Sequence, residues 1–269
     1  MIHPMVTVVV PAYNQEDYIE ETLQSILAQS FADYEVIVVD DGSEDGTGQV
    51  VSRIRDHRFH YVYQANSGRP ACSRNRGVSL AKGEYVAFLD GDDLWVPDKL
   101  EKQLQLFQDH PEFGLVFSNA FNFDEKGKRD LIVGKTISSG YLHPELFRHN
   151  FIAGCTVMAR KNCLDAAGGF NEGHDFIAVE DYDLWLRMSR RCPFGYIDEP
   201  LALYRLRAGS ASGGNVTSVL RLIHHLNVLR ERGDAPRWLY WKKYAALSYE
   251  LAAMTLVNAW RRHAKKAFR

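Results

Sequence analysis

The stretch that decides the fold is EYVAFLDGDDLW, residues 84–95. Its first half, Glu84 to Leu89, is a short apolar run, typical of a strand buried in a parallel sheet. The run ends at Asp90, and Asp92 and Asp93 follow directly. Carboxylates this close together repel one another, so the folded chain must supply a positive charge that holds them. The nature of that charge is the question that the sequence raises.

Two further strands with polar ends are expected before this one. Val6 to Val10 is a β-branched run that leads into PAYN, and Tyr34 to Val39 leads into DDGS. Helical spacing of apolar residues in Glu16 to Gln29 predicts a helix between them. This alternation predicts an α/β fold with a Rossmann-like, mostly parallel sheet flanked by helices. The carboxyl ends of such strands meet at one edge, where open α/β sheets bind their ligands.

Later elements are less regular. Apolar patterns predict helices at Ser43 to Arg55, Arg74 to Lys82, Asp98 to Asp109 and Val179 to Arg191. Residues 151–159 are expected to form a further strand, and residues 124–150 are polar and irregular. No internal repeat is present in the sequence.

The charge distribution divides the chain into two parts. Residues 215–269 contain eleven lysines and arginines against three acids, a net charge of +8, which leaves −10 for residues 1–214 of the total of −2. The second part is helical in character and is interrupted near 233–236. We therefore expect a domain at 1–214 that contains the sheet and a basic helical C-terminal extension at 215–269.

Composition indicates a cytoplasmic protein. The four cysteines form no CxxC pair, so reduced thiols are expected rather than a zinc site or a disulfide framework. No basic leader precedes the first apolar run, so no signal peptide is expected. The most apolar long segment, Tyr244 to Trp260, is too short and too polar for a membrane span.

A divalent cation is the positive charge that the acidic cluster predicts. The sequence contains neither a GxxxxGK[ST] loop nor a GxGxxG turn, so the phosphates of a nucleotide would need another partner. Mn²⁺ or Mg²⁺ typically bridges one or two carboxylates to a diphosphate. Gly91 would leave room for the close approach of that ligand. Residues 90–93 therefore predict a metal–diphosphate site.

Four segments, in the same order, resemble the inverting family 2 glycosyltransferases, which have the GT-A fold. They are VVVPAYNQEDYIEETLQSILAQSFADYEVIVVDDGSEDGT at 8–47, NSGRPACSRNRGVSLAKGEYVAFLDGDDLWVPDKLEKQ at 66–103, GGFNE with VEDYDLWLR within 168–187, and YRLRAGSAS at 204–212. The resemblance implies transfer of a sugar, with inversion, from a nucleoside diphosphate sugar to an acceptor hydroxyl in glycan or polysaccharide synthesis. It further implies a UDP-sugar donor and a carbohydrate or lipid-linked acceptor.

The resemblance also implies roles for individual residues. The implied nucleotide-binding residues are Pro11, Tyr13, Asp41, Arg74, Asp90 and Asp92. Tyr13 would stack on the base and Asp41 would accept its ring N–H, although the adjacent Asp40 could be the structural member of the pair. Asp92 and Asp93 would hold Mn²⁺ or Mg²⁺. Asp181 would be the general base that deprotonates the acceptor hydroxyl.

One position departs from the family pattern. The family often has a histidine two residues after the arginine that corresponds to Arg205, and this chain has Arg207 there. A guanidinium has no lone pair with which to coordinate a metal. Arg207 is therefore either a diphosphate contact that partly replaces a metal ligand or a surface arginine in a flexible loop.

Other interpretations stay open at this point. A haloacid-dehalogenase-like phosphohydrolase would use Asp90 as a nucleophile, and a catalytically degenerate glycosyltransferase would only bind. The basic extension would pack on the first domain, form a homodimer, or contact the inner face of a membrane as a peripheral protein. Nucleic-acid binding is not expected, because the rest of the chain is acidic and contains no recognition motif.

Overall fold

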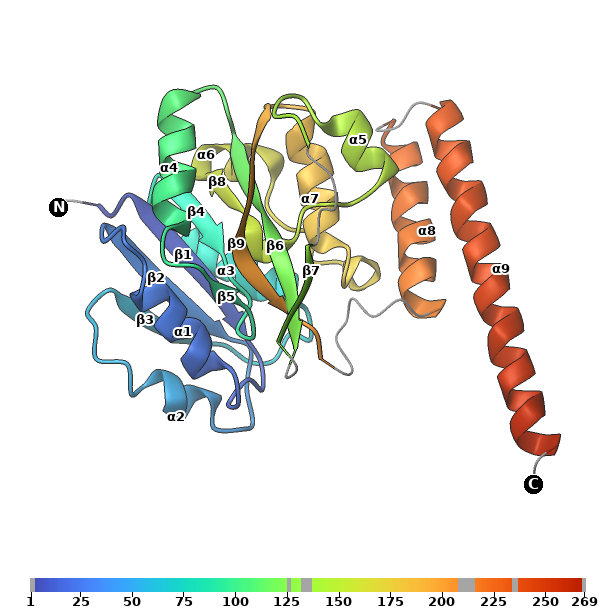
Figure 1. Ribbon diagram of the computed structural model, residues 1–269, viewed down its shortest axis with the longest axis horizontal. Helices are drawn as coiled ribbons and strands as arrows, with labels where there is room; N and C mark the ends of the chain where they lie inside the picture. Colours follow the sequence, from blue (N-terminus) through green and yellow to red (C-terminus); the bar gives the residue numbers. More distant parts are fainter. Residues whose placement is uncertain (1–2, 125–126, 132–136, 208–215, 234–236, 268–269) are drawn as a thin grey trace.

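One sheet forms the centre of the molecule (Figure 1). The computed structural model describes residues 3–124, 127–131, 137–207, 216–233 and 237–267. Its strands are β1 (Val6–Ala12), β2 (Tyr34–Asp40), β3 (Phe59–Tyr63), β4 (Tyr85–Phe88), β5 (Leu94–Trp95), β6 (Leu115–Asp124), β7 (Gly127–Leu131), β8 (Met158–Arg160) and β9 (Phe194–Arg205). The strand order is β3-β2-β1-β4-β8-β6-β9-β5, with β7 paired to β6.

The helices lie around this sheet. They are α1 (Ile19–Leu27), α2 (Thr47–Val51), α3 (Pro70–Leu80), α4 (Lys99–Asp109), α5 (His143–Arg148), α6 (Lys161–Ala167), α7 (Glu180–Ser189), α8 (Val216–Glu231) and α9 (Arg237–Ala267). Two short 3₁₀ helices are η1 (Gly154–Thr156) and η2 (His174–Phe176).

The first half of the sheet is parallel, as the sequence predicts. β3, β2, β1 and β4 pair in parallel, and Ala12 lies opposite Asp40, so the polar segments that follow β1 and β2 meet at one edge. The second half is mixed, because β8 pairs antiparallel with both β4 and β6. The α/β expectation is therefore confirmed, and the sheet as a whole is mixed rather than mostly parallel.

Alternating side chains of β1 build two cores, one on each face of the sheet. Val8 and Val10 pack into the cluster under α1 and α4, and Val9 packs into the cluster that α3 and α7 cover. The backbone of α3 approaches β1 closely at Gly77, where an added Cβ would lie 2.3 Å from Val9 Cγ1. This contact fixes α3, which carries Arg74, against the strand that leads into the predicted nucleotide pocket.

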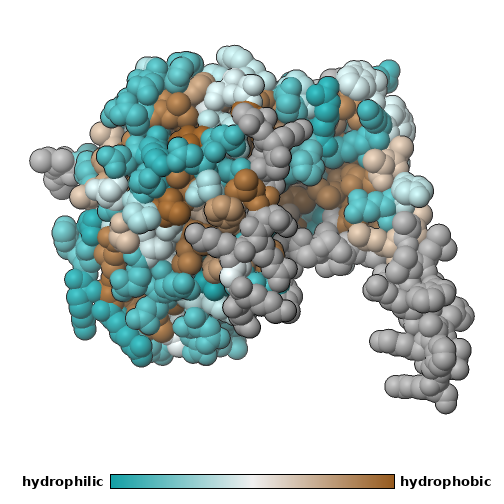
Figure 2. All heavy atoms as spheres, in the orientation of Figure 1, coloured by the Kyte–Doolittle hydropathy of each residue, from teal (hydrophilic) through white to brown (hydrophobic). Residues whose placement is uncertain are grey.

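The basic extension packs on the rest of the molecule. Apolar residues of α8 and α9, among them Leu226, Leu239 and Leu247, belong to the same core cluster as Leu186 of α7. Figure 2 shows apolar side chains where these helices meet the body. Within the described residues, no helix combines the length and apolarity needed to cross a membrane. The basic extension therefore packs on the first domain through α8 and the first half of α9, which is one of the alternatives that the sequence left open.

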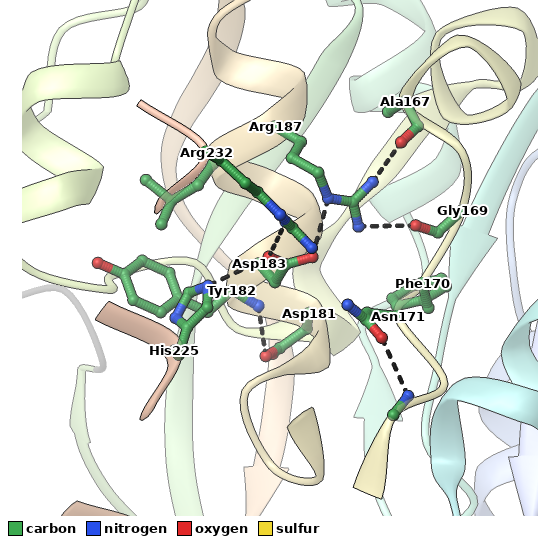
Figure 3. A network of polar contacts seen from close by, with 12 residues as sticks. Ala167, Gly169, Phe170, Asn171, Asp181, Tyr182, Asp183, Arg187, His225 and Arg232 are labelled. Carbon is green, nitrogen blue, oxygen red and sulfur yellow. Dashed lines mark hydrogen bonds and ion pairs between the residues drawn. The ribbon is translucent and has the colours of Figure 1, made fainter. Parts of the chain in front are cut away.

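A buried carboxylate joins α7 to the extension (Figure 3). Asp183 accepts a hydrogen bond from Arg187 Nε at 2.8 Å, and its Oδ1 lies 3.2 Å from both His225 Nε2 and Arg232 Nη1. Burial by itself would raise the pKa of Asp183, but the His225 hydrogen bond and the Arg187 charge hold that pKa below its usual value. The carboxylate therefore stays ionised and connects three side chains from α7, α8 and the turn after α8.

Removing this carboxylate is expected to destabilise the fold. Asp183→Ala leaves the buried His225 and the partly buried Arg187 without their carboxylate partner, so we expect a loss of about 3–5 kcal/mol in the free energy of unfolding. Asp165→Ala removes a half-exposed carboxylate whose i,i+4 partner is Lys161, and it should cost less than about 1 kcal/mol. Urea denaturation of both variants measures the difference. Equal, small losses would show that Asp183 does not hold the extension.

Candidate active site

The segments after β1 and β2 are bonded to each other. The backbone N–H of Asn14 donates to Ser43 Oγ at 2.9 Å, and Asn14 Oδ1 accepts the N–H of Glu44 at 2.9 Å. Asn14 adopts a left-handed conformation with φ 49°, which asparagine tolerates better than most residues do. These bonds fix the preceding residue, Tyr13, whose side chain is 45% exposed at the edge of the sheet.

The two aspartates after β2 have different surroundings. Asp40 is buried and accepts hydrogen bonds from the Tyr61 hydroxyl at 2.6 Å and from the Ser43 N–H at 2.8 Å. Asp41 accepts from Gln64 Nε2 at 2.6 Å and from Ser67 Oγ at 2.9 Å. Both aspartates are buried, and Asp41 is held by Gln64 and Ser67 on the segment between β3 and α3, so the structure gives each of them hydrogen-bond partners within the fold.

Two arginine side chains hold the first two carboxylates after β4. Arg74 donates from Nη2 to both oxygens of Asp90, at 2.7 and 3.0 Å. Arg207 places Nε 2.7 Å from Asp92 Oδ2, and Arg205 donates from Nε to the Asp92 carbonyl at 2.7 Å. In this structure the positive charge that the cluster requires therefore comes from Arg74 and Arg207.

The third carboxylate is held differently. Asp93 is only 2% exposed, and its Oδ1 accepts the backbone N–H of Arg205 at 2.8 Å. Burial, and then the charges of Asp92 and Asp90, raise the pKa of Asp93 well above its usual value. Burial therefore opposes a negative charge on Asp93, whereas arginines compensate the charges of Asp90 and Asp92.

Arg74 also connects the acidic cluster to α7. Its Nη1 donates to Glu180 Oε1 at 2.7 Å, while its Nη2 binds Asp90. The arginine is 8% exposed and Glu180 is 5% exposed, so this ion pair is buried. The guanidinium of Arg74 therefore bridges Asp90, at the end of β4, to the first turn of α7.

The carboxyl group next to Glu180 has the properties of a base. Asp181 is partly exposed, and its Oδ1 accepts the N–H of Tyr182 at 2.6 Å. Burial, and then the Glu180 charge, raise the pKa of Asp181 to about 7, although the Arg74 charge opposes them. A carboxyl group with a pKa near neutrality is well suited to accept a proton at physiological pH.

The residues of the acidic cluster fit a divalent cation in part. Among the described residues, no three His, Cys, Asp or Glu side chains converge on one point. The Asp92 side chain is 15% exposed and accessible from the edge of the sheet, whereas the Asp93 carboxyl is buried beneath it. Mg²⁺ and similar ions often take one carboxylate together with phosphate oxygens and water. Asp92 therefore fits as a ligand, and Asp93 does so less well.

Gly91 has a structural explanation in the packing around it. An added Cβ would lie 3.1 Å from Ile19 Cδ1 and 3.3 Å from the Pro11 carbonyl oxygen. Glycine allows the loop after β4 to pack against the end of β1 and the start of α1 at this point. Pro11, which sequence analysis assigned to the nucleoside pocket, is thereby placed next to the acidic cluster.

Several contributors to the site were not predicted. Gln64 and Ser67 bind Asp41, Glu180 binds Arg74, and Arg205 binds the 92–93 backbone and side chain. Glu180 carried a local signal, since it is next to Asp181, and Arg205 lies in the segment 204–212 that resembles the family. The other contacts join residues far apart in the chain, and no spacing rule indicates them.

Comparison with known proteins identifies the family. The family model described as Glycosyl transferase family 2 matches residues 7–166. The chain belongs to this family. It is a glycosyltransferase, and the resemblance to the family 2 glycosyltransferases is confirmed.

Relatives cover most of its length. TuaG of Bacillus subtilis (strain 168), named as a teichuronic acid biosynthesis glycosyltransferase, is 37% identical over 219 residues, covering 78% of this chain and 82% of TuaG. WfaP of Escherichia coli, a UDP-Glc:α-D-GlcNAc-diphosphoundecaprenol β-1,3-glucosyltransferase, is 31% identical over 230 residues, covering 85% of this chain and 87% of WfaP.

Solved structures share the GT-A fold. TarS of S. aureus in complex with UDP-GlcNAc has a TM-score of 0.70 at 23% identity, over 83% of this chain and 65% of that chain. The mannosyltransferase PcManGT of Pyrobaculum calidifontis, in complex with GDP-Man and Mn²⁺, has a TM-score of 0.70 at 20% identity, over 98% of this chain and 76% of that chain. At these identities the likeness shows the fold alone.

The bridge through Arg74 predicts a specific loss of stability. Arg74→Met leaves the buried Glu180 carboxylate without its counter-charge, so we expect the free energy of unfolding to fall by about 3–5 kcal/mol. The double variant Arg74→Met/Glu180→Gln should recover part of that loss, because the stranded charge is gone. Arg76→Met, at an exposed position of the same helix, is the control and should change stability by less than about 0.5 kcal/mol. Additive single effects in a double-mutant cycle would contradict the bridge.

Proposed function

We propose that this enzyme transfers a sugar, with inversion, from a UDP-sugar to a hydroxyl of a carbohydrate or lipid-linked acceptor during glycan synthesis. One observation supports this most. Arg74 joins Asp90, beside the proposed donor site, to Glu180, the neighbour of a carboxyl group whose pKa is about 7. A donor pocket and a base next to each other are what a single displacement needs.

The nucleoside is proposed to bind at the ends of β1 and β2. Tyr13 is exposed and would stack on the base, Pro11 would line the pocket, and Asp41 would accept the ring N–H. Asp41 already accepts hydrogen bonds from Gln64 Nε2, Ser67 Oγ and the Ser67 N–H, so the ring N–H would replace one of these bonds. The UDP-GlcNAc complex of TarS and the UDP-Glc in the name of WfaP support a UDP-sugar.

Mn²⁺ or Mg²⁺ is proposed as the cofactor, with Asp92 as its protein ligand and Asp93 beneath it. Such an ion neutralises charge that develops on the departing diphosphate. In this structure Arg207 forms an ion pair with Asp92, with Nε 2.7 Å from Oδ2. We propose that Arg207 leaves Asp92 when the donor and cation bind, and then contacts the diphosphate. The Mn²⁺ complex of PcManGT supports a cation in this fold.

Asp181 is proposed as the general base. In its ionised form it would accept the proton of the acceptor hydroxyl while the hydroxyl oxygen attacks the anomeric carbon opposite the leaving diphosphate. One such displacement inverts the configuration. General-base assistance of this kind typically contributes about 10²–10⁴-fold to the rate. Arg74 would position the neighbouring Glu180 and hold Asp90 rather than react.

The rival interpretations are weaker. A phosphohydrolase of this type would use the segment after β4 but leaves the second acidic segment, DDGS at 40–43, without a role. A degenerate, binding-only subunit would have no use for a base, and the chain retains Asp181 with a pKa near 7. Family membership favours the transferase over both.

Nucleotide binding tests the donor assignment. At about 100 times its Kd, UDP should stabilise the folded protein by roughly 2.7 kcal/mol, seen as a rise in Tm. We expect Mn²⁺ to strengthen the effect and Asp92→Ala to abolish the Mn²⁺ contribution. Asp165→Ala is the control, because Asp165 is an exposed residue of α6 that pairs with Lys161 of the same helix. Stabilisation by GDP but not by UDP would reject the proposed donor class.

The pH dependence of turnover tests the base. Asp181 works only when deprotonated, so kcat/KM should rise with pH along a limb of apparent pKa about 7 and level off above it. Asp181→Asn should lower kcat by about 10²–10⁴-fold and lose this limb, with UDP binding retained. Asp175→Asn, which changes an exposed carboxylate close to α7 in the chain, should keep the wild-type kcat and the limb of the pH profile. UDP release in the presence of acceptor is the readout, and near-normal turnover of Asp181→Asn would remove it from the mechanism.

A further inference from the structure

The outer side of α9 exposes aromatic side chains. Trp238 is 62% exposed, Trp241 57% and Tyr249 79%. Their spacing along a helix with 3.6 residues per turn places them on one side. Leu239 and Leu247 lie on the opposite side and are buried against the body. The described part of α9 is thus apolar toward the body and aromatic toward the outside.

Positive charge accompanies this aromatic side. Lys242 is exposed between Trp241 and Tyr249, and Arg237 is exposed beside Trp238. Residues 215–269 carry a net charge of +8, and residues 1–214 carry −10 of the total of −2. An anionic surface would therefore attract the C-terminal helices and repel the rest of the protein, which orients the molecule with α9 toward that surface.

A groove lies next to Trp241 between α8 and α9. Its volume is about 450 Å³, and its lining includes the aromatic rings of Tyr240, Trp241 and Tyr244 with His224 and Arg230 as basic groups. The Arg230 guanidinium lies over the Tyr240 ring at 5.1 Å. Glu231 also lines the groove. Aromatic walls with a cation at the rim suit the boundary between phosphate headgroups and acyl chains.

We propose that this face of α9, formed by Trp238, Trp241, Lys242 and Tyr249, binds the surface of a membrane that contains anionic phospholipid. The aromatic rings would enter the headgroup region while Lys242 and Arg237 contact lipid phosphates. A second copy of the chain is a poorer occupant, because it would bring two strongly basic segments together. The proposal rests on the proposed function in one respect: membrane binding would bring the active site to a lipid-linked acceptor.

The test measures binding of the full chain to vesicles. Wild-type protein should sediment with phosphatidylcholine vesicles that contain about one third phosphatidylglycerol, and much less with phosphatidylcholine alone. Rising salt should weaken the binding. Trp238→Ser/Trp241→Ser should bind about tenfold more weakly, and Lys242→Glu at least about fivefold more weakly. Tyr141→Ser, which removes a 68% exposed aromatic from the body, is the control and should bind as wild type.

The outcomes separate this proposal from the transferase assignment. Unchanged stabilisation by UDP in the double tryptophan variant shows that it is folded and keeps its donor site. Failure of the wild type to bind anionic vesicles, or equal binding by the double variant, would overturn the proposal even if UDP binds. A dimer that the double variant abolishes, measured by analytical ultracentrifugation without lipid, would assign the face to a second copy. Vesicle binding without stabilisation by UDP would support the membrane-binding face and count against a UDP-sugar donor.

Discussion

The fold around the active site depends on how three neighbouring carboxylates are kept together at the end of β4. Arg74 holds Asp90, Arg207 holds Asp92, and the buried Asp93 accepts the backbone N–H of Arg205. Arg74 comes from α3, which directly precedes β4 in the chain, and Arg207 comes from just beyond β9. Removing one partner of a buried ion pair leaves an uncompensated charge, which is costly. The attraction between these carboxylates and the two arginines thus fixes α3 and the end of β9 around the cluster.

These contacts continue across the molecule. Arg74 binds Glu180 in the first turn of α7, and Asp183 in the same turn region binds His225 of α8. Lys243 of α9 donates to the Tyr182 hydroxyl at 2.6 Å. The helix that carries the proposed base is therefore held from the donor side by the acidic cluster and from the other side by the basic extension. A surface that orients the extension would orient the acceptor site with it.

The elements that local sequence patterns determine were predicted from the sequence. The β-branched run of β1, the apolar run of β2 and their polar ends were found, as was the break between α8 and α9. β9 (Phe194–Arg205) was missed, because Asp198, Glu199 and Pro200 interrupt its apolar pattern. The strand expected over 151–159 is mostly η1 and β8, since β8 (Met158–Arg160) pairs for only three residues. The sequence predicted a metal at the acidic cluster but not the ion pairs that Arg74 and Arg207 make there; Arg207 lies 115 positions from Asp92, a separation that no local pattern encodes.

The central claim is that Asp92 exchanges Arg207 for a cation and a diphosphate when the donor binds. A crystal structure of the protein with UDP and Mn²⁺ tests it most directly. The account predicts the uracil beside Asp41 and Tyr13, the cation between Asp92 and the diphosphate, and Arg207 no longer on Asp92 Oδ2. A nucleotide bound away from the ends of β1 and β2, or an Asp92–Arg207 pair that persists with the cation bound elsewhere, would contradict it.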